Sequence, residues 1–290
     1  MKQLAIVSGK GGTGKTTLSS SFGALLNNAV LADCDVDAAN LNLMFNGELK
    51  EKYDYYGGKK AIIDQNKCDK CGICKNICRF EAITFENGIY DVDPYACEGC
   101  NACVIACPQD AIRLETALSG EYYYSSVNDE KDIVHANLNP GEETSGGLVA
   151  EVRKLAMNKA QEKGKDIVLI DGAPGIGCPA TSSITATDYV VIVTEPTSSG
   201  LHDLKRIIET VRYFKRPFGV VINKYDLNPV VSKEIINYCI SDNIEILGEI
   251  PFDETVEKSN LEINPIVNYE DSIAAKAIKE IFEKVMEKLK

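Results

Sequence analysis

The chain has 290 residues, and 31 lysine and arginine residues against 43 aspartate and glutamate residues give a formal net charge of −12 at pH 7. This acidic balance argues against general nucleic-acid binding, because phosphate backbones are bound by basic surfaces. No apolar run reaches the roughly 20 residues of a membrane-spanning helix. Met1 leads directly into a short apolar segment, so we expect no signal peptide, no stable membrane insertion and a cytoplasmic protein. Disulfides are rare there, so the 11 cysteines indicate metal binding or redox chemistry.

Short apolar segments alternate with helical patterns along most of the chain. We predict strands at residues 4–7, 29–32, 167–170, 189–194, 218–222 and 244–250. We predict helices at residues 15–26, 143–162, 201–215, 230–242 and 271–289. Val- and Ile-rich strands that alternate with helices are typical of a parallel sheet covered on both faces. The expected fold class is therefore α/β, with a mostly parallel sheet flanked by helices.

The segment from about residue 47 to residue 120 interrupts this alternation and contains eight of the 11 cysteines. It repeats internally, because CDKCGICKNICRFEAI at residues 68–83 aligns with CEGCNACVIACPQDAI at residues 97–112. We interpret residues 58–118 as a small α+β module inserted into a larger domain of residues 1–48 and 120–290. The alternative, that these cysteines belong to the α/β core, does not explain their shared spacing.

A glycine-rich loop follows the first predicted strand and precedes the first predicted helix. The segment GKGGTGKT, residues 9–16, fits the P-loop pattern G-x-x-x-x-G-K-[ST]. Glycines let backbone N–H groups approach phosphate oxygens, and a helix N-terminus favours negative charge. In this motif Lys15 reaches the β- and γ-phosphates, and the Thr16 hydroxyl ligates Mg²⁺. The alternative is a tight strand-to-helix turn without a ligand, against which the Lys-Thr pair argues.

A second lysine in the loop, Lys10, narrows the class of P-loop protein that the sequence resembles. GKGGTGKTT resembles the deviant P-loop of the MinD/ParA/nitrogenase-iron-protein superfamily of ATPases, whose early lysine contacts nucleotide phosphate across a dimer interface. The segments LADCDVD at residues 31–37 and IDGAPG at residues 170–175 stand where that family has its switch segments. The resemblance implies Mg²⁺-dependent ATP hydrolysis with Lys10, Lys15 and Asp35 as catalytic residues.

The resemblance also implies a ligand set for the nucleotide and its metal. Asp35 would orient the attacking water, and Mg²⁺ would be held by Thr16, Asp35 and Asp171. The nucleotide would be bound by Gly9, Lys10, Gly11, Gly12, Thr13, Gly14, Lys15, Thr16, Thr17, Asn223 and Pro251.

Some of these assignments have alternatives. For Asp33 and Asp37, a solvated strand end explains the carboxylate equally well. Asn223 begins an NKYD segment that also resembles the guanine-specific NKxD of GTPases, so the choice of ATP over GTP rests on Lys10 and the family. Pro251 is explained almost as well as an ordinary turn proline.

The two cysteine runs reproduce the C-x2-C-x2-C-x3-C spacing of bacterial ferredoxins, in which the fourth cysteine of each run ligates the other cluster. This predicts one [4Fe–4S] cluster on Cys68, Cys71, Cys74 and Cys107, and a second on Cys97, Cys100, Cys103 and Cys78. Structural zinc is the alternative, but zinc sites pair one C-x2–4-C with a distant second pair. Arg79 follows Cys78 where a proline is expected. This departure leaves the type of the second cluster open, and the arginine charge would raise its potential.

Three cysteines lie outside the module. We interpret Cys34 and Cys239 as small buried apolar side chains. For Cys178, a packed inert thiol is the simpler interpretation, and a redox or metal-binding thiol near a dimer interface is the alternative. We expect residues 122–140, which include His135, to dock the module on the larger domain. The apolar stripe of the last predicted helix should pack on the sheet rather than on a membrane.

Two functional hypotheses follow from the resemblance and the cysteine module. The first is an ATPase that couples nucleotide-driven switching to electron transfer through two [4Fe–4S] clusters towards a redox partner. It would work as a homodimer, or as a heterodimer with a related ATPase. The second is a carrier that delivers an iron–sulfur or other metal centre to an apoprotein. A third hypothesis is a spatial-positioning ATPase, as in partitioning systems. It is the weakest of the three, because it gives the cysteine module no function.

Overall fold

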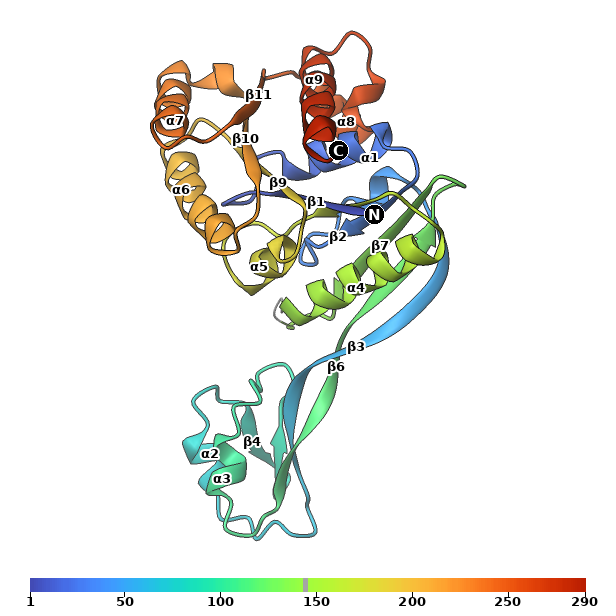
Figure 1. The fold of residues 1–290 in the computed structure, drawn as a ribbon. Helices are drawn as coiled ribbons and strands as arrows, with labels where there is room; N and C mark the ends of the chain where they lie inside the picture. The colour runs from blue at the N-terminus through green and yellow to red at the C-terminus, as the bar shows by residue number, and fades with distance from the viewer. Residues whose placement is uncertain (143–145) are drawn as a thin grey trace. The chain divides into compact units, whose positions relative to one another are not determined.

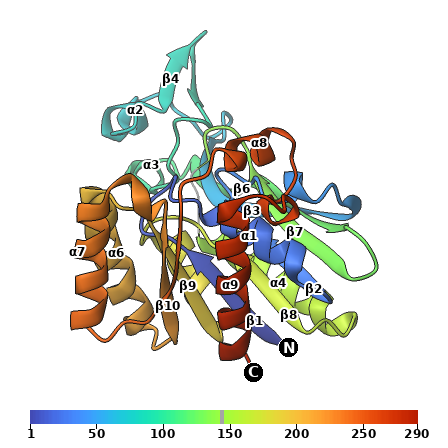
Figure 2. The same ribbon diagram turned by 90° about the horizontal axis from the view of Figure 1, so that it is seen from above.

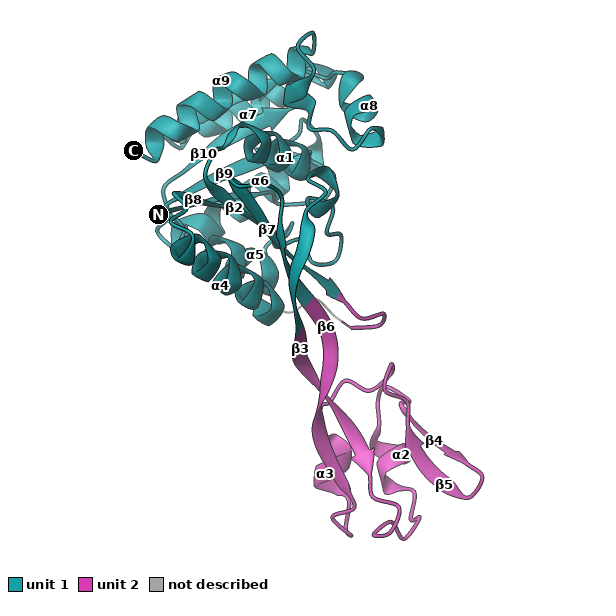
Figure 3. Ribbon diagram, turned by 90° about the vertical axis from the view of Figure 1, so that its right-hand side faces the viewer, with its two compact units in different colours: residues 1–53, 122–137, 144–290 teal, residues 54–121, 138–143 magenta. Residues whose placement is uncertain are grey.

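The computed structural model describes residues 1–142 and 146–290. The chain divides into two compact units, which Figure 3 shows in different colours. Unit 1 consists of residues 1–53, 122–137 and 144–290, and unit 2 of residues 54–121 and 138–143. The long strands β3 (Glu48–Ile63) and β6 (Ile112–Ser126) carry the chain from one unit into the other. The predicted cysteine module falls within unit 2.

In the part of the chain that the structure describes, the larger sheet has nine strands in the order β11-β10-β9-β1-β8-β2-β7-β6-β3. Its other strands are β1 (Lys2–Val7), β2 (Ala29–Asp33), β7 (Lys131–Leu138), β8 (Ile167–Asp171), β9 (Tyr189–Thr194), β10 (Phe218–Asn223) and β11 (Ile246–Ile250). All neighbours from β11 to β7 pair in parallel. The predicted α/β fold is therefore confirmed, and each of the six predicted strands is present.

Strand β7 was not predicted, because the sequence KDIVHANL mixes charged and amide side chains into its apolar positions. It nevertheless pairs with β2, and Ile133 and Val134 are fully covered. Pairing with a neighbouring strand thus stabilises an extended conformation that the local sequence pattern does not predict.

Helices cover both faces of the sheet of unit 1 (Figures 1 and 2). Helices α1 (Lys15–Leu25) and α9 (Ile273–Lys288) share one face with the shorter α8 (Thr255–Leu261). The opposite face carries α4 (Gly146–Glu162), α5 (Cys178–Ile184), α6 (Ser198–Tyr213) and α7 (Pro229–Ser241). Single 3-10 turns occur at η1 (Asn42–Met44), η2 (Tyr225–Leu227) and η3 (Ile266–Asn268).

All five predicted helices occur, but the predicted start of α4 at residues 143–145 lies outside the described residues. Helix α5 was missed because it is only one or two turns long and rich in Thr and Ser. The C-terminal helix packs as expected, since Ile278, Ile281 and Val285 are buried against the sheet. Over residues 1–142 and 146–290, no helix is long and apolar enough to cross a membrane.

The core of unit 1 lies on both sides of the central strands. Successive residues of β1 illustrate this, because Leu4, Ala5, Ile6 and Val7 are all 0% exposed although their side chains alternate between faces. On the α1 face, Phe22 meets Phe282 of α9 edge to face, with ring centroids 5.1 Å apart. Burial on both faces fixes the strand register, and with it the positions of the loops at the carboxyl ends.

Unit 2 is small and has a mixed α and β character. Strand β4 (Ile83–Glu86) pairs antiparallel with β5 (Ile89–Val92), and α2 (Ile73–Ile77) contacts α3 (Ala102–Ala106). Its core combines five apolar residues, Ala61, Ile63, Ala82, Ile83 and Ile112, with the cysteines Cys74, Cys97 and Cys103.

Candidate functional site

The predicted nucleotide residues of unit 1 meet at the edge of the sheet where its parallel strands end. The glycine loop follows β1, Asp33 ends β2, Asp171 ends β8, Asn223 ends β10 and Pro251 follows β11. Ligands of open α/β sheets bind at this edge. Segments from five parts of the chain therefore converge there.

The glycine loop forms a cradle at the start of α1. Gly12 and Gly14 have φ angles of +79° and +88°, which are strained for any residue with a Cβ. A Cβ at Gly14 would also lie 2.2 Å from Nδ2 of Asn223. Among the residues that the structure describes, the buried Thr13 hydroxyl has no hydrogen-bond partner. A glycine cradle with an unsatisfied hydroxyl is suited to an anionic ligand.

Lys15 and Asp171 form the buried centre of the site. Lys15 Nζ lies 2.8 Å from Asp171 Oδ1 and 3.4 Å from Asp35 Oδ2. The Thr16 hydroxyl donates to Asp171 Oδ2 at 2.9 Å, and the Ser19 hydroxyl donates to Asp171 Oδ1 at 2.7 Å. The structure thus brings the predicted lysine and both predicted Mg²⁺ carboxylates together. Ser19, one turn after Thr16, was missed because the P-loop pattern ends before it.

The neighbouring carboxylates hold the Lys15 side chain in its charged form. Burial disfavours the Lys15 ammonium, but Asp171 and Asp35 outweigh that cost and raise its pKa above the ordinary value. Burial also raises the pKa of Asp35, and the charge of Lys15 opposes that rise. Lys15 is therefore a permanent cation here, and it is occupied by carboxylates that a phosphate would replace.

Asp33 is not a solvated strand end, one of the two interpretations that the sequence left open. Its side chain is fully buried and accepts the backbone N–H groups of Asp35, at 3.2 Å, and of Leu41, at 2.9 Å. Burial, reinforced by the nearby Asp171 charge, raises the pKa of Asp33 well above its usual range. Asp33 therefore shapes the loop that carries Asp35, whereas Asp37 is exposed.

Lys10 is held within its own chain by a group that sequence reasoning did not find. Its Nζ lies 2.7 Å from Glu195 Oε1 and donates to the hydroxyls of Thr197, at 3.1 Å, and Ser199, at 3.0 Å. Glu195 follows β9, and Thr197 caps α6 by accepting the Gly200 N–H. No local motif marks these residues, because they lie more than 180 positions from the glycine loop.

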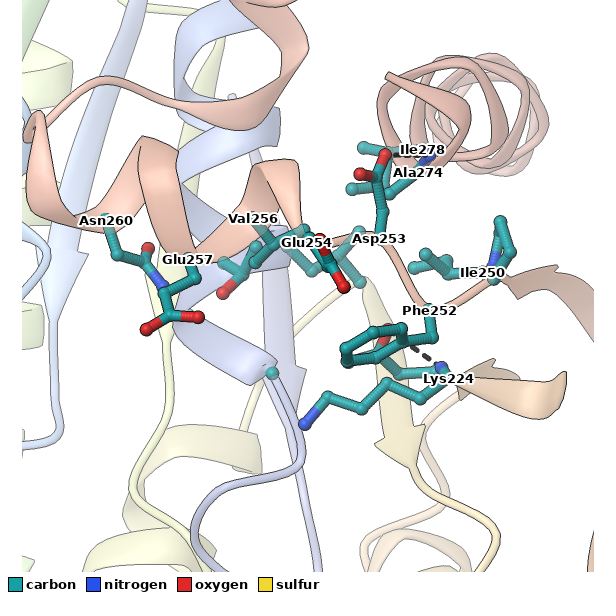
Figure 4. A pocket seen from close by; sticks show the side chains of 15 residues that line it. Lys224, Ile250, Phe252, Asp253, Glu254, Val256, Glu257, Asn260, Ala274 and Ile278 are labelled. Atoms are coloured by element: carbon teal, nitrogen blue, oxygen red, sulfur yellow. Dashed lines mark hydrogen bonds between the residues drawn. The ribbon is translucent and has the colours of Figure 1, made fainter. Parts of the chain in front are cut away.

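A pocket of about 240 Å³ opens beside the glycine loop. Figure 4 shows Ile250 and Ile278 on one side of it, and Glu257 and Asn260 of α8 on the other. Gly14, Asn223 and Pro251 also line this pocket, so the structure groups the predicted base-binding residues with the predicted phosphate cradle.

Two hydrogen bonds fix the segments that border this pocket. Asn223 Nδ2 donates to the Thr13 carbonyl at 2.8 Å, which ties the end of β10 to the loop. Asp226 Oδ1 accepts the Phe252 N–H at 2.7 Å and orders the segment after Pro251. The carboxylate that GTPases use for guanine is therefore engaged with the backbone here.

In unit 2, the eight clustered cysteines line two small cavities. The first is lined by Cys68, Cys71, Cys74 and Cys107 together with Pro108 and apolar side chains. The second is lined by Cys78, Cys97, Cys100 and Cys103 together with Phe80 and apolar side chains. Each cavity therefore takes three cysteines from one run and the fourth from the other, as the ferredoxin spacing predicts.

The backbone of unit 2 repeats with the cysteines. Three residues of the first half, Lys70, Gly72 and Glu81, have positive φ angles, and so do their counterparts 29 positions later, Gly99, Asn101 and Asp110. The Asp64 N–H donates to the Ala111 carbonyl, and the equivalent Asp93 N–H donates to the Ala82 carbonyl. Each half thus completes the other, which explains the crossed grouping of the cysteines.

All eleven cysteines are free thiols. In the described part of the chain, no three His, Cys, Asp or Glu side chains converge on a point that one metal ion would occupy. A four-iron cubane instead binds one thiolate at each of four separate corners. Backbone N–H groups already approach two of the sulfurs, since Ala61 donates to Cys97 Sγ and Ala111 to Cys107 Sγ, both at 3.4 Å.

The remaining cysteines differ in exposure. Cys34 and Cys239 are fully buried as expected, and burial raises the pKa of the Cys239 thiol to about 11. The expectation that Cys178 is packed is wrong, because this thiol is exposed at the start of α5. Gly177 and Pro179 turn the chain into α5 there, and this keeps the thiol out of the core. His135, on β7 within unit 1, stacks on Tyr123 with centroids 5.0 Å apart.

The chain is similar in sequence to several known proteins. The chain is 36% identical to an uncharacterised protein of Methanocaldococcus jannaschii over 98% of its own length and 96% of that protein. It is 30% identical to an iron-sulfur cluster carrier protein of Pyrococcus horikoshii, over 50% of this chain and 53% of the relative.

Solved structures show the same fold. The septum site-determining protein MinD of Pyrococcus horikoshii, complexed with Mg-ADP, superposes with a TM-score of 0.56 at 21% identity. That match covers 98% of this chain and 95% of the MinD chain. The family model of the CobQ/CobB/MinD/ParA nucleotide binding domain matches residues 4–266. The chain therefore belongs to the CobQ/CobB/MinD/ParA family of nucleotide-binding domains.

Proposed function

We propose that this protein hydrolyses ATP and couples the movement of its switch segments to electron transfer through two [4Fe–4S] clusters towards a partner protein. The observation that carries the proposal is the grouping of eight cysteines around two cavities in the crossed ferredoxin pattern. Because the same chain carries a MinD/ParA-type ATPase site, its nucleotide state and its redox state can influence each other.

The cysteine cavities fit iron–sulfur clusters in ligand type, number and grouping. Cys68, Cys71, Cys74 and Cys107 would hold one cluster, and Cys97, Cys100, Cys103 and Cys78 the other. Apolar side chains, including Ile63 and Ile112, line the first cavity, and Ala61 and Ile83 line the second. When bound, such clusters store and release single electrons. Structural zinc fits less well, because each group takes three cysteines from one run and one from the other, whereas zinc sites join two pairs.

In the ATPase site, the chain's own residues can perform the expected steps. Gly9 to Thr17 would cradle the phosphates, Thr16, Asp35 and Asp171 would hold Mg²⁺, and Asn223 and Pro251 would border the base. The engagement of Asp226 by the Phe252 N–H favours adenine over guanine. Lys15 would exchange its carboxylate partners for phosphate oxygens, which frees Asp35 to orient water.

Hydrogen bonds link the residues that take part in this exchange to both switch segments. The Asp171 carbonyl accepts the Cys34 N–H at 2.8 Å, so the end of β8 and the segment before Asp35 are joined by backbone. Asp33 holds the following residues through Leu41. A shift of Asp171 when Lys15 turns to phosphate would therefore reach the segment of residues 33–41. We further propose a dimer, of two copies or with a related ATPase, in which Lys10 contributes to the partner's nucleotide site.

A carrier function is the second candidate. Two observations favour it: the exposed thiol of Cys178, next to the second switch segment, and the relatives named iron-sulfur cluster carrier proteins. In this case the metal centre would be cargo, delivered to an apoprotein during the ATP cycle. Clusters that stay bound through repeated ATP cycles with an apo-acceptor present would rule the carrier function out.

The deciding experiment is anaerobic purification followed by iron and sulfide analysis and an EPR redox titration with and without Mg·ATP. Nucleotide-dependent potentials or line shapes are expected for coupled electron transfer. Lys15→Ala should abolish ATP hydrolysis and leave the iron content unchanged, while Lys2→Ala, on the exposed start of β1, should change neither. Colourless protein, or protein with zinc in place of iron, would overturn the proposal.

A further inference from the structure

The two halves of unit 2 share a backbone but differ in charge. Residues 67–79 contain four basic residues and one acidic residue, whereas the equivalent residues 96–108 contain only one charged residue, Glu98. The positive-φ positions and crossed hydrogen bonds coincide at the spacing of 29 residues. Because the fold of the two halves is matched, the difference in charge is not required by the backbone.

Three of the basic residues border the first cysteine set. Lys67 directly precedes Cys68, Lys70 precedes Cys71, and Lys75 follows Cys74. Neighbouring Cα atoms are about 3.8 Å apart, so each ammonium is tethered close to one of these cysteines. All three lysines are exposed. Their counterparts in the second half are Ala96, Gly99 and Val104. We call Lys67, Lys70 and Lys75 the lysine rim.

Apolar side chains and a cysteine are also exposed in the same stretch of sequence. Cys71 follows Lys70, Ile73 (41% exposed) precedes Lys75, and Ile77 (43% exposed) follows it. The acidic residue of this half, Asp69, accepts the Cys71 N–H at 3.1 Å and Gln109 Nε2 at 3.1 Å. Its carboxylate is therefore engaged with the protein rather than with a rim lysine.

We propose that the lysine rim is the docking site of an acidic protein that donates single electrons. This inference rests on the proposed function. The chain as a whole is acidic, with a net charge of −12, so an acidic partner is repelled except where cations gather. Transient redox partners typically meet over small interfaces, and complementary charges steer such encounters. One electron would leave the partner's reduced centre and be taken up at the Cys68, Cys71, Cys74 and Cys107 site, with no bond made or broken.

The charge of the lysine rim should also give the two cluster sites different reduction potentials. Uptake of an electron makes a cluster more negative, and nearby cations stabilise that state. The cysteines of the first site are flanked by the three rim lysines and Asp69, and those of the second by Glu98 and Arg79. Lys60 Nζ also donates to the Cys97 carbonyl of the second site, at 3.1 Å, but its charge is paired with Glu142. The first site should therefore have the higher reduction potential and accept the electron first.

The test measures binding of an acidic plant-type [2Fe–2S] ferredoxin to the anaerobically purified holoprotein by fluorescence anisotropy. For the wild type, raising NaCl from 50 to 300 mM should weaken binding at least tenfold. The triple variant Lys67→Glu, Lys70→Glu, Lys75→Glu should bind at least tenfold more weakly at 50 mM NaCl, and the matching Lys→Gln triple variant should fall between. In both variants, an EPR titration should show a lower potential for one cluster only.

The control is Arg113→Glu, a single charge reversal, one third of that in the triple variant, at an exposed residue of unit 2 that pairs with Glu115. It should bind within twofold of the wild type. Equal losses in the control and the triple variant, salt-independent binding, or full displacement by a DNA oligonucleotide would overturn the inference. Wild-type protein with both clusters but no ferredoxin binding refutes the docking site alone. Wild-type protein without iron refutes the proposed function and the docking site together.

Discussion

Lys10 has no spare hydrogen-bonding capacity in this structure. An ammonium group has three donors, and Glu195, Thr197 and Ser199 accept all of them. The Glu195 side chain is 17% exposed, so the ion pair is partly shielded from water. Lys10 must give up this pairing before it can contact a nucleotide phosphate. Glu195 therefore opposes the nucleotide contact that the family resemblance implies for Lys10.

Glu195→Gln should strengthen the nucleotide-bound state. The amide keeps the shape of the side chain but removes the charge, and a partly shielded ion pair contributes about 1 kcal/mol. We expect a roughly fivefold lower Kd for Mg·ATP, measured by displacement of a fluorescent ATP analogue. In a Lys10→Ala background the same substitution should change Kd less, because the 2.7 Å ion pair is gone and Lys224 Nζ, 4.0 Å from Glu195 Oε2, is the remaining ionic partner. An equal effect in both backgrounds would show that Glu195 acts on another group.

The residues of this site differ in how well the sequence predicted them. Lys15 and Thr16 belong to one contiguous motif whose spacing is set by the phosphate cradle, so a local pattern was enough. Glu195 was missed because its role depends on a tertiary contact. Asp33 was left undecided because its burial depends on residues up to Leu41 folding back over it. Residues of a contiguous motif could thus be predicted from the sequence, whereas residues whose role depends on tertiary contacts could not.

At the scale of elements, one carboxylate joins the starts of two helices. Asp253 Oδ1 accepts the Thr255 N–H of α8 at 2.9 Å. Its Oδ2 accepts the Ser272 hydroxyl at 2.6 Å and the Ala274 N–H of α9 at 3.2 Å. Burial alone would raise the pKa of Asp253, but these hydrogen bonds outweigh it and hold the pKa well below its usual range.

Asp253→Asn should destabilise the protein at neutral pH and much less in acid. The unfolded carboxyl has a pKa of about 3.9, and the folded one is lower, so the carboxylate stabilises the fold above pH 4. That contribution is lost as pH falls through the folded pKa. The amide keeps only one acceptor oxygen and carries no charge, so we expect a loss of about 2 kcal/mol at pH 7, the size of a hydrogen bond to a charged group, measured by urea denaturation.

The control for this substitution is Glu280→Gln on the exposed face of α9. It should leave the free energy of unfolding within about 0.5 kcal/mol of the wild type at each pH. A difference between wild type and Asp253→Asn that stays constant from pH 7 to pH 3 would contradict the assignment, because an uncharged packing effect does not titrate.

Elements were predictable where local pattern and burial agree. The central strands are Val- and Ile-rich because both of their faces are covered, which is a strong signal. The long strand β3 reads ELKEKYDYYGGKKAII, and its charged and glycine residues gave no strand signal. Its extended form depends on pairing with a partner strand, which the sequence of β3 alone does not reveal.

At the scale of the whole molecule, the central question is whether the two cysteine runs act as one interdependent unit. The structure places Cys107 in the cavity of Cys68, Cys71 and Cys74, although it lies 33 or more positions after them in the chain. The backbone bonds of Asp64 to Ala111 and of Asp93 to Ala82 cross between the halves in the same way. Neither half can therefore complete its own site, and a ligand lost from one half should empty a site in the other.

Cys107→Ser should abolish the same cluster as Cys68→Ser. Each single variant should retain about half of the wild-type iron, since one of two equal clusters is lost. The double variant should retain the same half, because both substitutions affect one site. The matched control combines Cys68→Ser with Cys97→Ser, which belong to different sites, and it should lose nearly all iron. Sites confined to their own runs would contradict this result, because Cys68→Ser with Cys107→Ser would then lose nearly all the iron, as the control does.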